Sequence, residues 1–181
     1  GCVAQVVKSN HPDFSVGQMV QATNGWQDYA VVDPAHPPSS LRPMPEGAPP
    51  EMMLSVLGVT GLTAYFGLLD VGEPNEGNTV LVSAAAGSVG HMVGQIANIK
   101  GCQTVGITST PEKCQQLQAK VGFDSALSYR SEDFRGELKD TCANGVDIYF
   151  DNTGGDILGM ALRRMNVHSR IVCCGVVSQY D

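Results

Sequence analysis

An apolar run that ends in a turn of small residues is the feature that most constrains how this chain folds. Residues 80–83 predict a buried strand, and a helical pattern begins directly after the small residues that follow it. In that order, a backbone without bulky side chains can approach a large anion, and the N–H groups at the start of the helix face it. The frame Ala85-x-Gly87-x-x-Gly90 differs from the dinucleotide fingerprint G-x-G-x-x-G by alanine at the first position. We therefore expect a dinucleotide pyrophosphate at this turn; the alternative is a tight turn without a ligand.

Strand and helix patterns alternate through the rest of the sequence in steps of about 25 residues, which predicts βαβ units and a parallel sheet. Pro111 stands in the first turn of one predicted helix, and Gly122 ends it. The expected fold class is α/β, a doubly wound (Rossmann) parallel sheet, which normally has six strands in the order 3-2-1-4-5-6. The sequence ends after the fifth strand, so we expect the last strand to be lacking. The expected strands are 80–83, 104–107, 125–128, 146–150 and 170–174, and the expected helices are 88–100, 111–121, 132–141 and 155–165.

The first 48 residues predict a different kind of structure. Short strand patterns at 3–7, 19–22 and 26–32 are separated by turn residues, and prolines punctuate the stretch that follows. We expect residues 1–48 to be the C-terminal remnant of a mostly β domain and residues 49–181 to be the dinucleotide-binding domain. A helical pattern over 51–69, interrupted by Gly58 and Gly61, leads into that second domain.

Composition excludes several classes of protein. Hydrophobic residues make up 43% of the 181 residues and charged residues 16%, so a globular core is expected and disorder is not. The net charge of -7 and the lack of basic runs disfavour nucleic acid and anionic membranes as partners. No apolar stretch reaches membrane-spanning length, and no signal peptide is recognisable. Six cysteines without C-x-x-C spacing and four scattered histidines predict no metal site and a reduced, cytoplasmic protein.

The end of the second predicted strand indicates which dinucleotide is bound. An NAD site places Asp or Glu there, to bind the ribose 2′-hydroxyl. Here small hydroxyl residues stand in its place and Lys113 follows, so we expect NADP, with Lys113 at the 2′-phosphate. The alternative is that Lys113 is a solvated helix residue. Tyr129 and Arg130, at the end of the third strand, are expected near the adenine ribose or its phosphate, or else they are ordinary strand-end residues.

The ends of the fourth and fifth strands lie over the crevice where ligands of such sheets bind. Asn152 follows the fourth strand and offers donors and an acceptor to a ribose or carboxamide. The alternative is a helix N-cap at Asp151, Asn152 or Thr153. The segment from Cys174 to Tyr180 follows the fifth strand, and its tyrosine is a candidate proton donor or ribose contact.

Several stretches together resemble one family. They are residues 25–31, 57–68 and 83–90, the sequence Tyr-Phe-Asp-Asn-Thr-Gly-Gly at 149–155 and the sequence Cys-Gly-Val-Val-Ser-Gln-Tyr at 174–180. The chain is similar over essentially its whole length to the zinc-independent medium-chain dehydrogenase/reductases. Within them it most resembles the branch of leukotriene B4 dehydrogenase/prostaglandin reductases, curcumin reductase and alkenal double-bond reductases. The resemblance implies that residues 1–48 come from a GroES-like catalytic domain, and that a full member is nearly twice as long.

The resemblance also implies a function and a site. It implies NADPH-dependent reduction of the C=C bond of α,β-unsaturated ketones or aldehydes (2-alkenal, curcumin or 15-oxoprostaglandin type), in a homodimer when full length. Quinone reduction and non-catalytic NADPH binding are the alternatives, and the activity of this chain by itself stays open. Tyr180 is the expected catalytic residue, and no metal ligand is expected. The expected cofactor-binding residues are Gly87, Ser88, Val89, Gly90, Lys113, Tyr129, Asn152, Cys174, Gly175, Val176, Val177, Ser178 and Tyr180.

Overall fold

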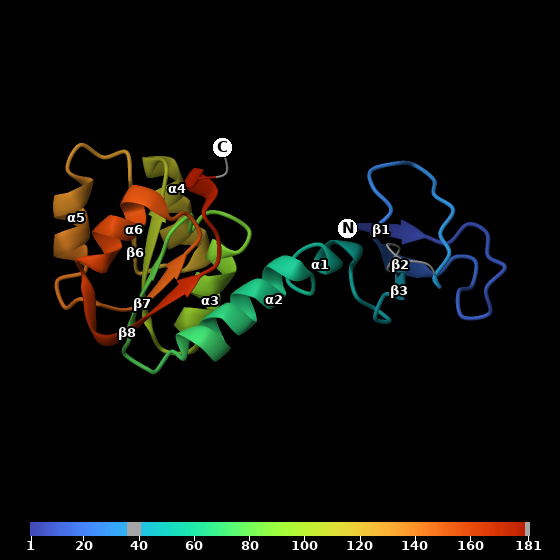
Figure 1. Cartoon of the computed structure of the whole chain (residues 1–181), viewed down its shortest axis with the longest axis horizontal. Coiled ribbons are helices and arrows are strands. Elements are labelled where there is room, and N and C mark those ends of the chain that lie inside the picture. Colours follow the sequence, from blue (N-terminus) through green and yellow to red (C-terminus); the bar gives the residue numbers. More distant parts are fainter. Residues whose placement is uncertain (36–40, 180–181) are drawn as a thin grey trace. The chain divides into compact units, whose positions relative to one another are not determined.

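The computed structural model describes residues 1–35 and 41–179, and the chain divides into two compact units, Gly1–Thr60 and Gly61–Asp181 (Figure 1). The unit boundary lies twelve residues beyond the expected domain limit at 48, since the residues up to Thr60 make most of their contacts with the first unit. The two units are described one at a time.

The first unit contains an antiparallel sheet of three short strands in the order β1-β2-β3. The bounds are β1 Cys2–Gln5, β2 Met19–Ala22 and β3 Arg42–Pro43, followed by helix α1 Pro50–Met53. The first two strands agree with the expected positions. The expected strand at 26–32 is wrong: these residues form no strand, and the side chains of Trp26 and Val31 are fully exposed. A strand needs a partner for its N–H and C=O groups and a face to bury, and no described segment supplies either.

The expected helix over 51–69 is broken where the sequence places Gly58. A Cβ at Gly58 would lie 2.4 Å from the Met53 carbonyl oxygen, so only glycine fits this close return of the chain. Helix α2 Val59–Phe66 begins directly afterwards and continues as a π-helical segment, η1 Gly67–Gly72. Gly61 does not interrupt the helix; it lies buried within α2.

The second unit is a five-stranded parallel sheet in the order β6-β5-β4-β7-β8. In chain order this is 3-2-1-4-5, so the expected doubly wound topology is confirmed for the five strands that the chain contains. Strand β8 is longer than expected, because α6 ends early and β8 begins at Met165. The bounds are β4 Thr79–Val82, β5 Gln103–Thr108, β6 Ser125–Ser128, β7 Val146–Asp151 and β8 Met165–Cys173.

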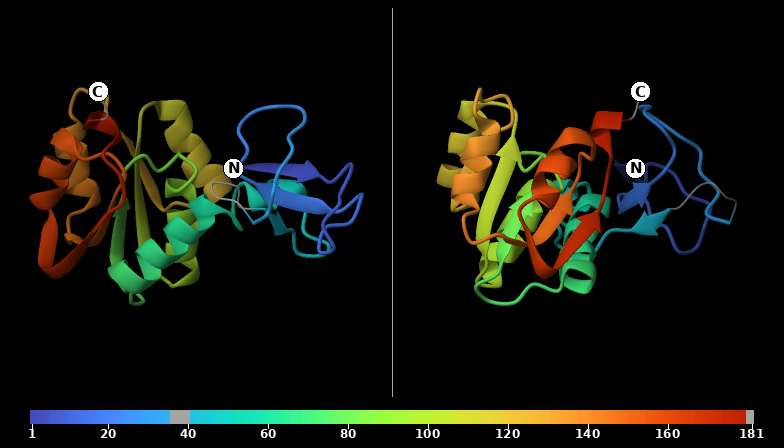
Figure 2. Two further views of the ribbon diagram at one scale, coloured as in Figure 1. Left: turned by 45° about the vertical axis from the view of Figure 1, so that its right-hand side comes forward. Right: turned by 60° about the vertical axis from the view of Figure 1, so that its left-hand side comes forward.

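Helices cover both faces of this sheet (Figures 1 and 2). Side chains alternate along each strand, so Val80, Val82 and Phe150 pack toward α2 and α3, while Leu81 and Tyr149 pack toward α5 and α6. The central strands β4 and β7 are therefore buried on both faces. The helices are α3 Gly90–Ile99, α4 Pro111–Gln116 with its π-helical continuation η2 Leu117–Val121, α5 Phe134–Thr141, α6 Gly155–Leu162 and the short η3 Val177–Gln179.

Local signals set several of the helix ends. Thr110 caps α4 with Pro111 behind it, and Gly122 ends η2 with a φ of 92°, as the sequence predicts. Asp133 caps α5 by accepting a hydrogen bond from the Gly136 N–H. Within residues 1–35 and 41–179, no helix has the length and apolar character needed to cross a membrane.

Candidate functional site

The turn after β4 lies over the carboxyl ends of three neighbouring strands. The Ser83 N–H donates to Phe150 O on β7 (3.1 Å), and the Ala85 N–H donates to Ile107 O on β5 (2.9 Å). Ala84 between them has a φ of 47°, so the tight turn uses the left-handed region at an alanine and not at a glycine. The chain then reaches α3, which begins at Gly90, two residues later than expected, and has no side-chain cap.

The two glycines of the frame differ in how closely the turn surrounds them: the nearest atom to a Cβ would be Ala84 O in both cases, at 2.5 Å for Gly90 and 3.1 Å for Gly87. A Cβ at Gly90 would lie 2.5 Å from Ala84 O and 2.7 Å from Ala85 Cα, so α3 can pack against the turn only with glycine there. Gly87 is exposed, and its N–H donates to Ala84 O over 2.8 Å. Ala85 is tolerated at the first frame position because it faces Gly106, where a Cβ would come within 3.0 Å of the Ala85 methyl. The turn therefore presents backbone and small side chains, with Ser88 exposed and Val89 half-buried, which fits a pyrophosphate.

Lys113 lies in the first turn of α4, five residues beyond Thr108, the last residue of β5. Its backbone N–H donates to the Thr110 hydroxyl that caps α4, and its Nζ donates to Ser109 Oγ over 3.3 Å. No Asp or Glu stands between residues 103 and 110. Glu112 lies in the same helical turn, and its own N–H and the Thr110 hydroxyl lower the pKa of its carboxyl group. The ammonium of Lys113 thus has one acidic neighbour in sequence and a hydroxyl as its contact.

Tyr129 and Arg130 lie next to that strand end. The Tyr129 N–H donates to Thr108 O over 2.9 Å, which places the tyrosine beside the last residue of β5. Its ring is partly exposed, and the guanidinium of Arg130 lies 5.6 Å from the ring centroid. Two cations and one exposed ring therefore gather near the ends of β5 and β6, where an adenosine phosphate is expected.

Asn152 is buried, and its side chain is committed to the turn after β4. Its Nδ2 donates to Ser83 O over 2.7 Å, and its N–H donates to Ser83 Oγ over 2.9 Å. The alternative of a side-chain cap at Asp151, Asn152 or Thr153 is wrong, because α6 is preceded by Gly154 with no side-chain cap. Sequence reasoning also missed Ser83, although a serine directly after Val-Leu-Val was the signal for a polar contact at the strand end.

The segment after β8 runs alongside the end of β7. The N–H groups of Cys174 and Gly175 both donate to Asp151 O, and the Val177 and Ser178 N–H groups donate to Asn152 O and Thr153 O. Gly155 leaves room for this segment, since a Cβ there would lie 2.8 Å from Ser178 Oγ. Val176 and Val177 are exposed, and Cys174 is a half-buried thiol whose pKa is raised by burial and by Asp151. Tyr180 lies outside the described residues.

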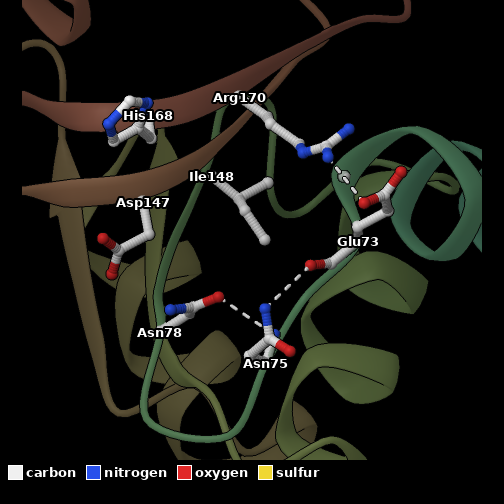
Figure 3. Close-up of a pocket in the computed structure, with 8 residues that line it drawn as sticks. Glu73, Asn75, Asn78, Asp147, Ile148, His168 and Arg170 are labelled. Carbon is white, nitrogen blue, oxygen red and sulfur yellow. Dashed lines mark hydrogen bonds and ion pairs between the residues drawn. The ribbon is translucent and has the colours of Figure 1, made fainter.

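A polar pocket of 240 Å³ lies at the opposite, amino-terminal edge of the sheet (Figure 3). Asn78 precedes β4, Asp147 lies near the start of β7, and Arg170 lies on β8. Ligands of open α/β sheets bind at the carboxyl edge, so this pocket is not part of the site. Among the described residues, no group of three or more His, Cys, Asp or Glu side chains is placed to hold a metal ion.

Comparison with known proteins agrees with this geometry. Residues 88–181 match the family model described as zinc-binding dehydrogenase, and residues 1–38 match the N-terminal domain of oxidoreductase. The chain is 43% identical to the NADPH-dependent curcumin reductase of Escherichia coli (strain K12), over 100% of its own length. The chain belongs to the zinc-independent medium-chain dehydrogenase/reductases. The resemblance seen in the sequence is thereby confirmed, together with the α/β fold.

Two further relatives place this medium-chain dehydrogenase/reductase more closely. It is 40% identical to (+)-pulegone reductase of Mentha piperita, over 99% of the chain and 52% of that protein. Its fold overlays that of CurA from Vibrio vulnificus in complex with NADPH with a TM-score of 0.90, at 44% identity, over 98% of the chain and 52% of CurA. The chain spans about half the length of the relatives it matches, 52% of the curcumin reductase included.

Proposed function

We propose that this chain is the NADPH-binding part of a reductase that acts on the C=C bond of α,β-unsaturated ketones or aldehydes. The observation that carries the proposal is its likeness, over 98% of its residues, to a structure solved with NADPH. Curcumin and pulegone, named in two relatives, both contain an alkene conjugated to a carbonyl group. That shared chemistry defines the proposed substrate class.

Different residues of the chain would bind different parts of the cofactor. The turn at Gly87, Ser88, Val89 and Gly90 would hold the pyrophosphate, with the Gly87 N–H itself already donated to Ala84 O. Lys113 and Tyr129 would hold the 2′-phosphate, because no carboxylate of β5 repels it there. Asn152 and the segment Cys174, Gly175, Val176, Val177 and Ser178 would line the nicotinamide end. NADPH supplies a hydride when it is bound.

Reduction of a conjugated alkene also requires a proton and control of negative charge on the substrate carbonyl oxygen. Hydrogen-bond donors in a site that excludes water would stabilise that charge. We propose Tyr180 as the residue that donates the proton or orients the substrate, together with water. A homodimer of the full-length protein and a cytoplasmic location complete the proposal; the six free thiols of the chain fit a reducing compartment.

The test is consumption of NADPH by the purified protein, followed by absorbance, with pulegone as the enone and with a quinone in parallel. Turnover of the enone that depends on NADPH and is weak with NADH supports the proposal. Efficient quinone turnover with an inert enone would contradict the substrate class. Saturable NADPH binding without turnover of a broad panel of enones would indicate a binding protein. An absence of NADPH binding would contradict the whole proposal.

A further inference from the structure

Asp151, the last residue of β7, is a buried carboxylate on which several hydrogen bonds converge. Its side chain is 2% exposed. Its Oδ1 accepts hydrogen bonds from two side-chain hydroxyls, Ser83 Oγ directly after β4 (3.1 Å) and Tyr149 OH on β7 itself (2.9 Å). The same oxygen accepts the N–H groups of Thr153 (3.0 Å) and Gly154 (2.9 Å), and the Thr153 hydroxyl (3.3 Å). Five donors from four residues therefore share one oxygen atom.

This carboxylate is held by neutral donors. In residues 1–35 and 41–179, none of the ion pairs involves Asp151. A buried charge is costly unless hydrogen bonds satisfy it, and hydrogen bonds to a charged acceptor are stronger than neutral ones. Burial, together with the adjacent carboxylate, raises the pKa of Tyr149, so its hydroxyl stays protonated and donates. The Oδ1 of Asp151 is thus the common acceptor for all five donors.

The donors come from three different parts of the site. Ser83 begins the turn after β4, Tyr149 belongs to β7, and Thr153 and Gly154 lead into α6. The register explains the first contact: Val82 pairs with Phe150, so the residues that follow them lie side by side. The Ser83 hydroxyl donates to Asp151 and accepts the Asn152 N–H. The main-chain oxygen of Asp151 accepts the N–H groups of Cys174 and Gly175.

We propose that Asp151 is a positioning residue that fixes Asn152 and the segment 174–178 for the nicotinamide end of the cofactor. The inference rests on the proposed NADPH-binding function. Asp151 is too deeply buried to reach a substrate, so it acts through the groups it holds. Its loss would loosen the nicotinamide end, while the adenosine end, built from Lys113 and Tyr129 on other elements, would keep its shape.

Asp147 provides a matched control on the same strand. Its Oδ2 accepts the Thr79 N–H and its Oδ1 accepts Asn166 Nδ2, both over 2.8 Å. Asp147 therefore also ties β7 to β4 and β8, but at the opposite edge of the sheet. A purely structural role would make Asp151→Asn and Asp147→Asn equivalent in their effect on cofactor binding.

The experiment measures two ligands on wild type, Asp151→Asn and Asp147→Asn. NADPH binding is followed by nicotinamide fluorescence, and 2′,5′-ADP, which lacks the nicotinamide half, is followed by calorimetry. For Asp151→Asn we expect the Kd of NADPH to rise about tenfold, equivalent to about 1.4 kcal/mol, with the Kd of 2′,5′-ADP unchanged. Asp147→Asn should leave both constants unchanged. Equal losses for the two ligands, or equal effects of the two variants, would overturn the inference.

A milder variant covers the case in which Asp151→Asn does not fold. Tyr149→Phe removes one of the five donors and keeps the carboxylate. The Kd of NADPH should therefore rise about threefold, a smaller effect than the tenfold rise expected for Asp151→Asn. The Kd of 2′,5′-ADP should again be unchanged. An unchanged NADPH constant in Tyr149→Phe would contradict the inference. Wild-type protein that binds neither ligand would instead contradict the proposed function.

Discussion

The side-chain Nδ2 of Asn152 donates a 2.7 Å hydrogen bond to the main-chain oxygen of Ser83, a residue 69 positions earlier in the chain. Both residues are buried at the carboxyl edge of the sheet. The bond joins the end of β7 to the first residue of the small-residue turn, so the two halves of the crevice share one rigid contact.

Removing this contact should lower both stability and cofactor affinity. Asn152→Ala leaves Ser83 O without its partner, which costs about 1–3 kcal/mol of unfolding free energy for a buried polar group. Urea unfolding measures the loss, and NADPH fluorescence measures the weaker binding. Asn144→Ala, which removes an exposed amide, is the control and should change neither quantity. An Asn152→Ala protein as stable as wild type would contradict the buried contact.

Lys113 should discriminate NADPH from NADH. Lys113→Glu replaces a cation beside the expected 2′-phosphate by an anion. The Kd of NADPH should therefore rise at least about tenfold, while the Kd of NADH changes little. Fluorescence titration with each cofactor measures the two constants. Lys120→Glu makes the same charge change at an exposed position of η2 and is the control. An equal loss for both cofactors in Lys113→Glu would mean that the phosphate binds elsewhere.

Two glycine-to-alanine changes should act in opposite directions. Gly90→Ala forces a methyl within 2.5 Å of Ala84 O, and such overpacking costs roughly 1–3 kcal/mol. Gly159→Ala adds a methyl in open space inside α6, where alanine is a better helix former by about 0.5–1 kcal/mol. Thermal unfolding of both variants measures the difference. Equal melting temperatures would contradict the close packing of α3 against the turn.

The stability of the second unit should fall at alkaline pH. Burial raises the pKa of the Cys142 thiol from 9.0 to about 11, against the weaker influence of Arg164. Since the folded state holds this proton more tightly than the unfolded state, the contribution is complete below pH 9 and is lost as the pH rises toward 11. The slope is about 1.4 kcal/mol per pH unit for one group. Urea unfolding across this range should show a shallower fall for Cys142→Ala, and parallel curves would contradict the shift.

Tyr180→Phe keeps the aromatic ring and removes the hydroxyl. If Tyr180 is an obligatory proton donor, loss of its hydroxyl should lower kcat by ~10²–10⁴-fold. We expect a modest fall in kcat together with a modest rise in the KM for NADPH, because water can also protonate the enolate that hydride transfer leaves. Steady-state kinetics with pulegone in a catalytically active form of the protein measure both constants. Unchanged constants for NADPH and for the enone would remove Tyr180 from the site.

Local sequence signals predicted the α/β alternation and most element positions in the second unit. Hydrophobic periodicity is short in range, and the central strands β4 and β7 are mostly apolar because both of their faces are buried. Residues 26–32 show the limit of such signals, since a strand also needs a partner that local pattern does not reveal. The motif and the strand ends indicated the turn at 85–90, Lys113 and Asn152, and the resemblance to a family completed the set of cofactor-binding residues; their roles stay predictions.

The sequence by itself determined the parallel sheet, the glycines of the turn and the absence of an acid at the end of β5, because these depend on neighbouring residues along the chain. Only the tertiary structure decided what Asp151, Asn152 and Ser83 do. Their contacts span 68 and 69 residues and depend on the pairing of Val82 with Phe150. Strand register is set by packing of the whole sheet, so a buried carboxylate that gathers five donors carries no local signature in the sequence.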